Sequence, residues 1–422
     1  MVTTLGEISR ESAKRFGDKI ALIIEDKSFS YKEIDAMACR VANGLKASGV
    51  RPGDRVTLYS ANCWEWAVSY HAIAKIGAVI NPINVMLTSD EVKYVVEDSG
   101  TTAVLGSADK AESLLDLKGN NELKEVVLFG DTVPTGATSF EEWLKSGTDT
   151  FEVAHRNRED LAAICYTSGT TGHPKGAMHS HHNILANAQG TAMMHVRTES
   201  DVMVNSLPLP HVYGSVVFNS GFMYGAKLVI VPRFEEEVVM SAIQQHRATI
   251  LDGVPTAYYF LLAHPKFDDY DLSTLTRSTV GGQTLPAAKS IEWEERVGTA
   301  VLELWGMTEL AGAATANPYY GDNKPGTIGL VYPGSEGKIV SAEDPTLDLE
   351  IGDEGEFMFR GPLVMLGYYG NDEATRDAMA AGGWMHTGDI ATQDEDGYFT
   401  IVDRKKDMIL TAGYNVYPAE LE

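Results

Sequence analysis

The stretch YTSGTTGHPKG, from Tyr166 to Gly176, places three glycines, five hydroxyl side chains and one lysine within eleven residues. It follows Ala162–Tyr166, an apolar run that predicts a buried strand. A glycine-rich loop at the end of a strand can turn backbone N–H groups toward a phosphate, because glycine allows positive φ and close approach. The lysine adds a positive charge, so the stretch predicts a phosphate-binding loop.

This loop differs from the P-loop of nucleotide triphosphatases. Lys175 follows Gly172 after His173 and Pro174, and Gly176 comes next. The P-loop pattern instead has Gly-Lys followed by Ser or Thr. Taken alone, the residues leave two interpretations open: a phosphate-binding loop of another class, or a flexible surface loop.

Strand and helix signals alternate through the first two thirds of the chain. Thr88–Glu91 has the form of a capping box, which predicts the start of a helix, and Gly100 suits its end. Another predicted helix contains Trp64 and Trp66. The segments predicted as strands are Arg55–Ser60, Thr101–Gly106, Lys124–Gly130, Ala226–Pro232 and Ala248–Val254. This alternation is typical of an α/β protein with helix-covered sheets.

The pattern changes after residue 310, where Gly and Pro become frequent. Short predicted strands, such as Glu356–Arg360 and Tyr398–Val402, follow without long helices. We therefore expect a small β-rich subdomain packed against the α/β body.

Composition excludes several partners. The formal net charge is −25, and such an acidic surface repels nucleic acid and anionic membranes.

Met1–Phe16 lacks the apolar segment of a signal peptide, and Ser215–Pro232 is too short and interrupted to span a bilayer. Cys39, Cys63 and Cys165 have no metal or disulfide spacing, which indicates buried thiols in a reducing compartment. We expect a cytoplasmic protein.

Together with the glycine–hydroxyl loop, other segments in order resemble the motifs of the adenylate-forming superfamily of acyl-CoA synthetases, luciferase-like enzymes and peptide-synthetase adenylation domains. They are an opening motif (Phe29–Glu33 and Gly49–Asp54), an adenine motif (Trp305–Glu309), a ribose motif (Trp384–Asp389) and a hinge (Asp403–Ile409). The resemblance implies two helix-covered mixed sheets and a small distorted β-barrel over residues 1–402, then a hinge at 403–406. Residues 407–422 would begin an α+β C-terminal domain that is almost wholly absent.

The resemblance also implies a two-step reaction. A carboxylate attacks the α-phosphorus of ATP and pyrophosphate leaves; a thiol, usually that of coenzyme A, then attacks the mixed anhydride and AMP leaves. Both steps develop negative charge, so positioning and electrostatic stabilisation carry the catalysis. ATP, Mg²⁺ and coenzyme A are the implied cofactors, and a small carboxylic acid is the substrate.

Resemblance assigns the nucleotide contacts residue by residue. Glu309 would bind Mg²⁺ through its carboxylate, because Mg²⁺ prefers oxygen ligands. Thr308 would contact the α-phosphate. Trp305 would stack on adenine, and Asp389 would accept both ribose hydroxyls. Lys406 would be the hinge residue, and would act in catalysis with Lys175, Thr308 and Glu309. The remaining implied nucleotide contacts are Thr167, Ser168, Gly169, Thr170, Thr171, Gly172, Lys175, Glu303, Gly306, Met307 and Arg404.

The acyl pocket is assigned in the same way. His211 is expected beside Tyr213 in the pocket wall and not as a base, because a carboxylic acid is already ionised at neutral pH. Residues 205–215 contain no acid to pair with an α-amine, which favours an uncharged acyl tail. The implied substrate contacts are His211, Val212, Tyr213, Arg233, Gly281, Gly282, Gln283, Leu304 and Gly306. The nearby His179, His181 and His182 lack the partners of a metal site.

Two positions bear on the acid's size. By resemblance, Gly306 leaves room for more than an acetyl group, whereas Leu304 narrows the slot. A short branched, medium-chain or alicyclic acid is expected, with an aryl acid as the first alternative.

Two further alternatives are a ligase that loads a carrier protein and a non-catalytic adenylate-binding module. The set of Lys175, Glu309, Asp389 and Arg404 argues against the module. Because the chain stops at Glu422, we expect it to bind an acyl-adenylate but to turn over very slowly.

Overall fold

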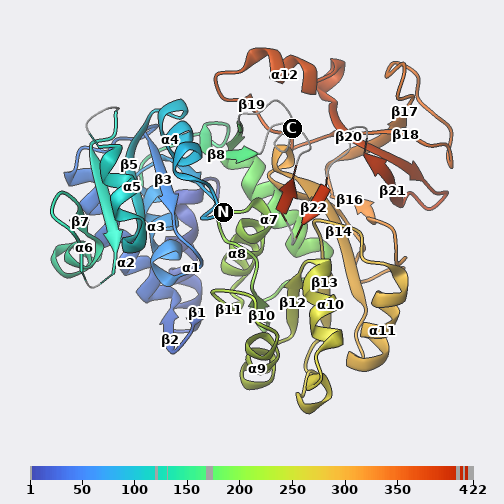
Figure 1. Cartoon of the computed structure of the whole chain (residues 1–422), viewed down its shortest axis with the longest axis horizontal. Helices are drawn as coiled ribbons and strands as arrows, with labels where there is room; N and C mark the ends of the chain where they lie inside the picture. Colours follow the sequence, from blue (N-terminus) through green and yellow to red (C-terminus); the bar gives the residue numbers. More distant parts are fainter. Residues whose placement is uncertain are drawn as a thin grey trace.

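The computed structural model describes residues 2–118, 122–130, 132–167, 174–404, 409–411 and 414–416. In these ranges the chain forms two large mixed sheets with helices packed on them, followed by a small sheet (Figure 1). The predicted α/β body and β-rich subdomain are confirmed, and the predicted strands lie within two residues of their observed ends. Among the described helices, none combines the length and apolar character needed to cross a bilayer.

The first sheet has eight strands in the order β19-β9-β8-β4-β3-β5-β6-β7. Strands β3 to β8 pair in parallel, while β9 and β19 run antiparallel to their neighbours. Its central strands are apolar and buried on both faces, as expected for parallel strands covered by helices. The bounds are β3 (Arg55–Tyr59), β4 (Val79–Pro82), β5 (Thr101–Ser107), β6 (Glu125–Phe129), β7 (Thr138–Ser139), β8 (Leu161–Thr167), β9 (Lys175–Ser180) and β19 (Gly367–Tyr368).

The second sheet has nine strands in the order β16-β15-β14-β13-β12-β10-β11-β1-β2. The six strands from β14 to β1 pair in parallel, and antiparallel strands flank them on both sides. The bounds are β1 (Ile20–Ile24), β2 (Lys27–Ser30), β10 (Val202–Asn205), β11 (Lys227–Ile230), β12 (Ile250–Gly253), β13 (Arg277–Val280), β14 (Val301–Met307), β15 (Gly312–Ala316) and β16 (Leu330–Val331).

The main core joins the two sheets through helices that are apolar on nearly all sides. Every residue of α3 except Glu65 is buried, and Trp66 of α3 meets Phe218 of α8 edge-on with ring centroids 5.8 Å apart. Helix α7 contacts strands of both sheets. A helix without a polar face is stable only when protein surrounds it. The bounds are α1 (Ile8–Phe16), α2 (Tyr31–Ala47), α3 (Trp64–Lys75), α4 (Ser89–Asp98), α5 (Ala111–Asp116), α6 (Phe140–Ser146), α7 (His181–Met194), α8 (Val212–Tyr224), α9 (Glu236–His246), α10 (Pro255–Ala263) and α11 (Ala287–Val297).

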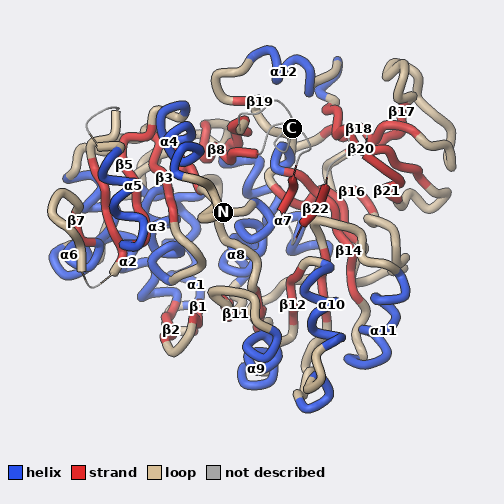
Figure 2. The backbone as a smooth tube through the Cα atoms, viewed as in Figure 1, coloured by secondary structure: helices blue, strands red, loops and turns tan. Residues whose placement is uncertain are grey.

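The small sheet contains β17 (Glu336–Val340), β18 (Gly355–Arg360), β20 (Met385–Gln393) and β21 (Phe399–Arg404), all antiparallel. It is poor in helix, as Figure 2 shows at the upper right. Between β18 and β20 the chain leaves this sheet, adds β19 to the edge of the first sheet and forms α12 (Asp372–Ala378). Beyond β21 the structure describes one strand pair, β22 (Ile409–Thr411) and β23 (Tyr414–Val416).

Candidate active site

The predicted phosphate loop connects two paired strands. Thr167 ends β8 and lies opposite Lys175, the first residue of β9, so the two ends of the loop are held together. The loop residues Ser168, Gly169, Thr170, Thr171 and Gly172 lie outside the described residues, as does Lys406. The strand before the loop was predicted, but β9 was not, because its residues KGAMHS are too small and polar to resemble a strand.

The adenine motif leads from β14 into a single helical turn, Thr308–Leu310. The buried His179 donates from Nε2 to the carbonyl oxygen of Thr308 at 2.7 Å, and Met365 N donates to the carbonyl oxygen of Glu309 at 2.9 Å. Burial lowers the pKa of His179 to about 4, so its ring is neutral at physiological pH. His179 therefore supports the turn that carries Thr308 and Glu309, a role that sequence reasoning missed.

Tyr368 of β19 reaches the same turn. Its hydroxyl donates to Oε1 of Glu309 at 2.7 Å, and Nζ of Lys175 lies 5.3 Å from its ring centroid. Tyr368 thus contacts two residues that the sequence assigned to the phosphates and the metal. Its own segment, Leu366–Gly370, carries no pattern that predicts this position.

The ribose and adenine motifs meet at Asp389. Nε1 of Trp305 donates to Oδ2 of Asp389 at 2.8 Å, and Nε of Arg404 pairs with Oδ1 at 2.9 Å. Burial raises the pKa of Asp389, the Arg404 and Trp305 contacts oppose that rise, and the charges of Glu309 and Glu356 add to it. Trp305 and Arg404 therefore contact Asp389 directly, and Glu309 lies close enough for its charge to affect the Asp389 pKa.

Glu303 lies on the same face of β14 as Trp305, because alternate residues of a strand share a face. Its side chain is buried, and its Oε1 accepts a hydrogen bond from Gly326 N at 2.6 Å. Burial raises its pKa to about 7. In this arrangement Glu303 holds the loop that contains Gly326, and its nucleotide contact stays a prediction.

Three of the predicted acyl residues, His211, Val212 and Tyr213, lie at the start of α8. His211 is the N-cap, and its Nδ1 accepts from Tyr213 N at 3.2 Å. His211 is exposed to solvent, yet desolvation by the protein atoms around its ring lowers its pKa. Tyr213 is buried, and its hydroxyl lies 3.0 Å from Oγ1 of Thr279.

The space expected beside Gly306 is occupied. A Cβ atom on Gly306 would lie 1.9 Å from the carbonyl oxygen of Gly312, because β15 packs directly against it. A Cβ atom on Gly281 would lie 2.4 Å from Cδ1 of Leu304. Leu304 thus fills the place beside Gly281, which agrees with a narrow slot, whereas the room inferred from Gly306 is absent on its side-chain side.

The remaining predicted substrate contacts are spread more widely. Val212 is buried, and its carbonyl oxygen lies near Gly312. Gly282 has a φ of +89°, which favours glycine, and the partly exposed Gln283 follows it. Arg233 is exposed, beyond the end of β11.

A buried ion pair is linked to Tyr213 through Thr279. Arg197 and Asp252 have no exposed side-chain surface, and Nη2 of Arg197 donates to Oδ1 of Asp252 at 2.5 Å. Oγ1 of Thr279 also donates to this oxygen, at 2.7 Å, and so links the pair to Tyr213. Sequence analysis did not single out these residues, because their partners are far apart in the chain.

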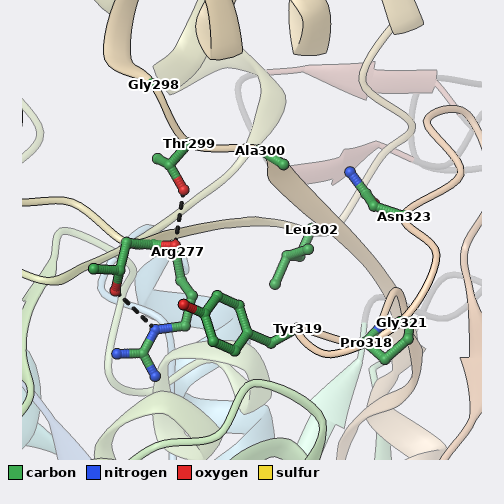
Figure 3. A pocket seen from close by; sticks show the side chains of 10 residues that line it. Arg277, Gly298, Thr299, Ala300, Leu302, Pro318, Tyr319, Gly321 and Asn323 are labelled. Carbon is green, nitrogen blue, oxygen red and sulfur yellow. Dashed lines mark hydrogen bonds between the residues drawn. The ribbon is translucent and has the colours of Figure 1, made fainter.

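A separate cavity of about 270 Å³ lies at the opposite end of β13 and β14 (Figure 3). Arg277 lies beside the ring of Tyr319 there, and its guanidinium pairs with Asp201 and donates to the carbonyl oxygens of His195 and Val196. The cavity contains none of the predicted site residues.

Glu309 is the carboxylate that the sequence assigns to a magnesium ion. Among the described residues, no group of three or more His, Cys, Asp or Glu side chains could hold a metal ion. Mg²⁺ commonly binds one or two carboxylates and takes its other ligands from phosphates and water. Glu309 lies in a turn that contacts β8 and β9, the strands on either side of the predicted phosphate loop, and is suited to that arrangement.

Comparison with known proteins identifies the family. Residues 9–369 match the AMP-binding enzyme family. A long-chain-fatty-acid–CoA ligase of Bacillus subtilis is 32% identical, over 99% of this chain and 80% of the relative. A feruloyl-CoA synthase of an Amycolatopsis species is 34% identical, over 94% of this chain and 77% of the relative.

Solved structures give the same result. The anthranilate CoA ligase AuaEII with anthranoyl-AMP has a TM-score of 0.90 and 30% identity, over 99% of this chain and 81% of that one. ATP-bound MatB from Rhodopseudomonas palustris has a TM-score of 0.89 and 33% identity, over 100% and 82%. The chain belongs to the AMP-binding enzyme family and is an AMP-forming acid–thiol ligase of the acyl-CoA synthetase type.

Proposed function

We propose that this chain activates a carboxylic acid with an uncharged acyl tail as its acyl-adenylate and then transfers the acyl group to the thiol of coenzyme A. The observation that carries the proposal is the convergence of Trp305 and Arg404 on the buried carboxylate of Asp389, beside Glu309. A buried carboxylate held by two donors is oriented to accept further hydrogen bonds from a ligand. The two hydroxyls of a ribose provide such donors.

The other residues have complementary tasks. Lys175 supplies positive charge at the end of the phosphate loop, where pyrophosphate would leave. Glu309 would hold Mg²⁺, which when bound neutralises charge on the phosphates. Arg404, which already contacts Asp389, would orient the ribose or the phosphate. These tasks are positioning and charge stabilisation, which is what phosphoryl chemistry requires of the protein.

For the acid, we propose a short branched, medium-chain or alicyclic acyl group. The contact of Leu304 with Gly281 and the buried Tyr213 support a narrow, apolar slot. Since relatives act on feruloyl and anthraniloyl groups as well as long-chain acids, an aryl acid is the second candidate.

The test is a calorimetric titration with non-hydrolysable acyl-sulfamoyl adenosines that carry acetyl, isobutyryl, hexanoyl, cyclohexanecarbonyl, benzoyl or lauroyl groups. We expect the isobutyryl, hexanoyl or cyclohexanecarbonyl compound to bind most tightly. Preference for benzoyl would favour the aryl alternative, and preference for acetyl or lauroyl would contradict the proposed acid class. A folded sample that binds none of them would contradict the adenylate site itself.

A further inference from the structure

We propose that Tyr368 is a positioning residue of the active site, which orients the carboxylate of Glu309 for Mg²⁺ and supports the ammonium of Lys175. This inference rests on the proposed function, since it concerns the residues expected to hold the metal and the phosphates. The two contacts come from different parts of one side chain: the hydroxyl meets Glu309 and the ring meets Lys175. They can therefore be removed separately.

The hydroxyl contact constrains Glu309. Tyr368 Oη lies 2.7 Å from Oε1, the distance of a hydrogen bond to a charged acceptor. With Oε1 held in place, the Oε2 atom has a defined direction in which to meet a cation. Outer hydrogen bonds of this kind orient metal ligands, and their loss weakens metal affinity.

The ring contact concerns Lys175. Its Nζ lies 5.3 Å from the centroid of the Tyr368 ring, within the range of a cation–π interaction. Lys175 is the first residue of β9, directly after the predicted phosphate loop. The ring can therefore hold the ammonium near the loop before a phosphate arrives.

The backbone fixes Tyr368 relative to both partners. Tyr368 pairs with Ala177 of β9, only two residues beyond Lys175. Its N–H donates to Oγ1 of Thr375 at 2.8 Å, and the next residue, Tyr369, donates from N to the carbonyl oxygen of Gly176 at 2.8 Å. Tyr368 is only 9% exposed, so its side chain has little freedom to move away.

The experiment compares Tyr368→Phe, which removes the hydroxyl alone, with Tyr368→Leu, which removes the ring as well. Tyr369→Phe is the matched control, because it makes the same chemical change at the next residue of the chain. Calorimetry measures the affinity for a non-hydrolysable ATP analogue over a series of Mg²⁺ concentrations. It also measures affinity for an acyl-sulfamoyl adenosine without Mg²⁺, a ligand that has no β- or γ-phosphate.

We expect Tyr368→Phe to raise the Mg²⁺ concentration for half-maximal promotion of analogue binding by about tenfold. Its affinity for the acyl-sulfamoyl adenosine should be unchanged, and Tyr369→Phe should match the parent chain in both titrations. Tyr368→Leu should in addition weaken Mg²⁺-free binding of the ATP analogue, because Lys175 loses the ring. In a Glu309→Gln background, Tyr368→Phe should have no further effect on the Mg²⁺ requirement.

An unchanged Mg²⁺ requirement in Tyr368→Phe would overturn the inference, as would an equal rise in the Tyr369→Phe control. If the parent chain fails to bind the acyl-sulfamoyl adenosine, the proposed function fails instead. A merely structural role for Tyr368 predicts equal weakening of both ligands, which would also contradict the inference.

Discussion

The two faces of strand β14 carry the two halves of the candidate site and are built by different means. On one face, Trp305 and Glu303 make directional hydrogen bonds, to Asp389 and to Gly326 N. On the other, Leu304 makes an apolar contact with Gly281. The contacts on the nucleotide face are thus directional and polar, whereas the contact on the acyl face is apolar packing. The acyl half also has a buried ion pair, Arg197 and Asp252, which Thr279 links to Tyr213.

The largest expected effect concerns that ion pair. Arg197→Met should lower the free energy of unfolding by about 3–5 kcal/mol, because it leaves Asp252 as an unpaired buried charge. Urea denaturation measures the loss. A double variant with Asp252→Leu should recover much of it, since both charges are then removed. A loss below about 1 kcal/mol, which is typical of surface pairs, would show that the acyl half does not depend on this pair.

The next prediction concerns Glu303, on the nucleotide face. Its pKa is raised from 4.5 to about 7, so the native state retains a proton that the unfolded state releases between these pH values. The contribution of Glu303 to the free energy of unfolding is therefore fully present below pH 4.5, is lost as pH rises to about 7, and does not change further above that pH. The fall is up to about 3 kcal/mol. Glu303→Gln should remove it, which is checked by the difference between the two unfolding curves at each pH.

Asp389 should dominate ligand binding on the same face. Asp389→Asn should weaken acyl-sulfamoyl adenosine binding by about a hundredfold, because two hydrogen bonds to a charged acceptor are altered. Since burial raises the Asp389 pKa above 3.8, acid should weaken binding by the parent chain with a midpoint above that value. The variant should lack this titration. Equal acid sensitivity in both proteins would assign the pH dependence to another group.

The smallest effect is expected on the acyl face. Leu304→Ala should open the space beside Gly281 and shift relative affinity toward larger acyl groups by roughly tenfold. Calorimetric titration with the acyl-sulfamoyl adenosine series measures this shift. The affinity for AMP, which has no acyl group, should not change. An equal loss of affinity for every acyl group would mean that a change on the apolar face of β14 also disturbs the polar face. That result would contradict the division of the site between the two faces.

Much of the nucleotide half could be predicted because its residues lie in short contiguous motifs. Trp305, Thr308 and Glu309 share one strand–turn segment, and Asp389 follows a glycine turn. Tyr368 could not be predicted, since it is 59 residues from Glu309 and only the sheet brings them together. The packing of β15 against Gly306 could not be predicted for the same reason: residue identity does not show which backbone packs against a glycine.

The course of the chain through β19 also has a mechanical consequence. The chain enters β19 from β18 and leaves it toward β20, and both of these strands belong to the small sheet. Strand β19 itself pairs with β9 at the edge of the first sheet. Any movement of the small sheet relative to Lys175 is therefore limited by the lengths of the two connecting segments, residues 361–366 and 369–384. A domain that rotates about the hinge predicted at 403–406 would therefore be attached to a sheet that the chain tethers twice to the edge strand carrying Tyr368.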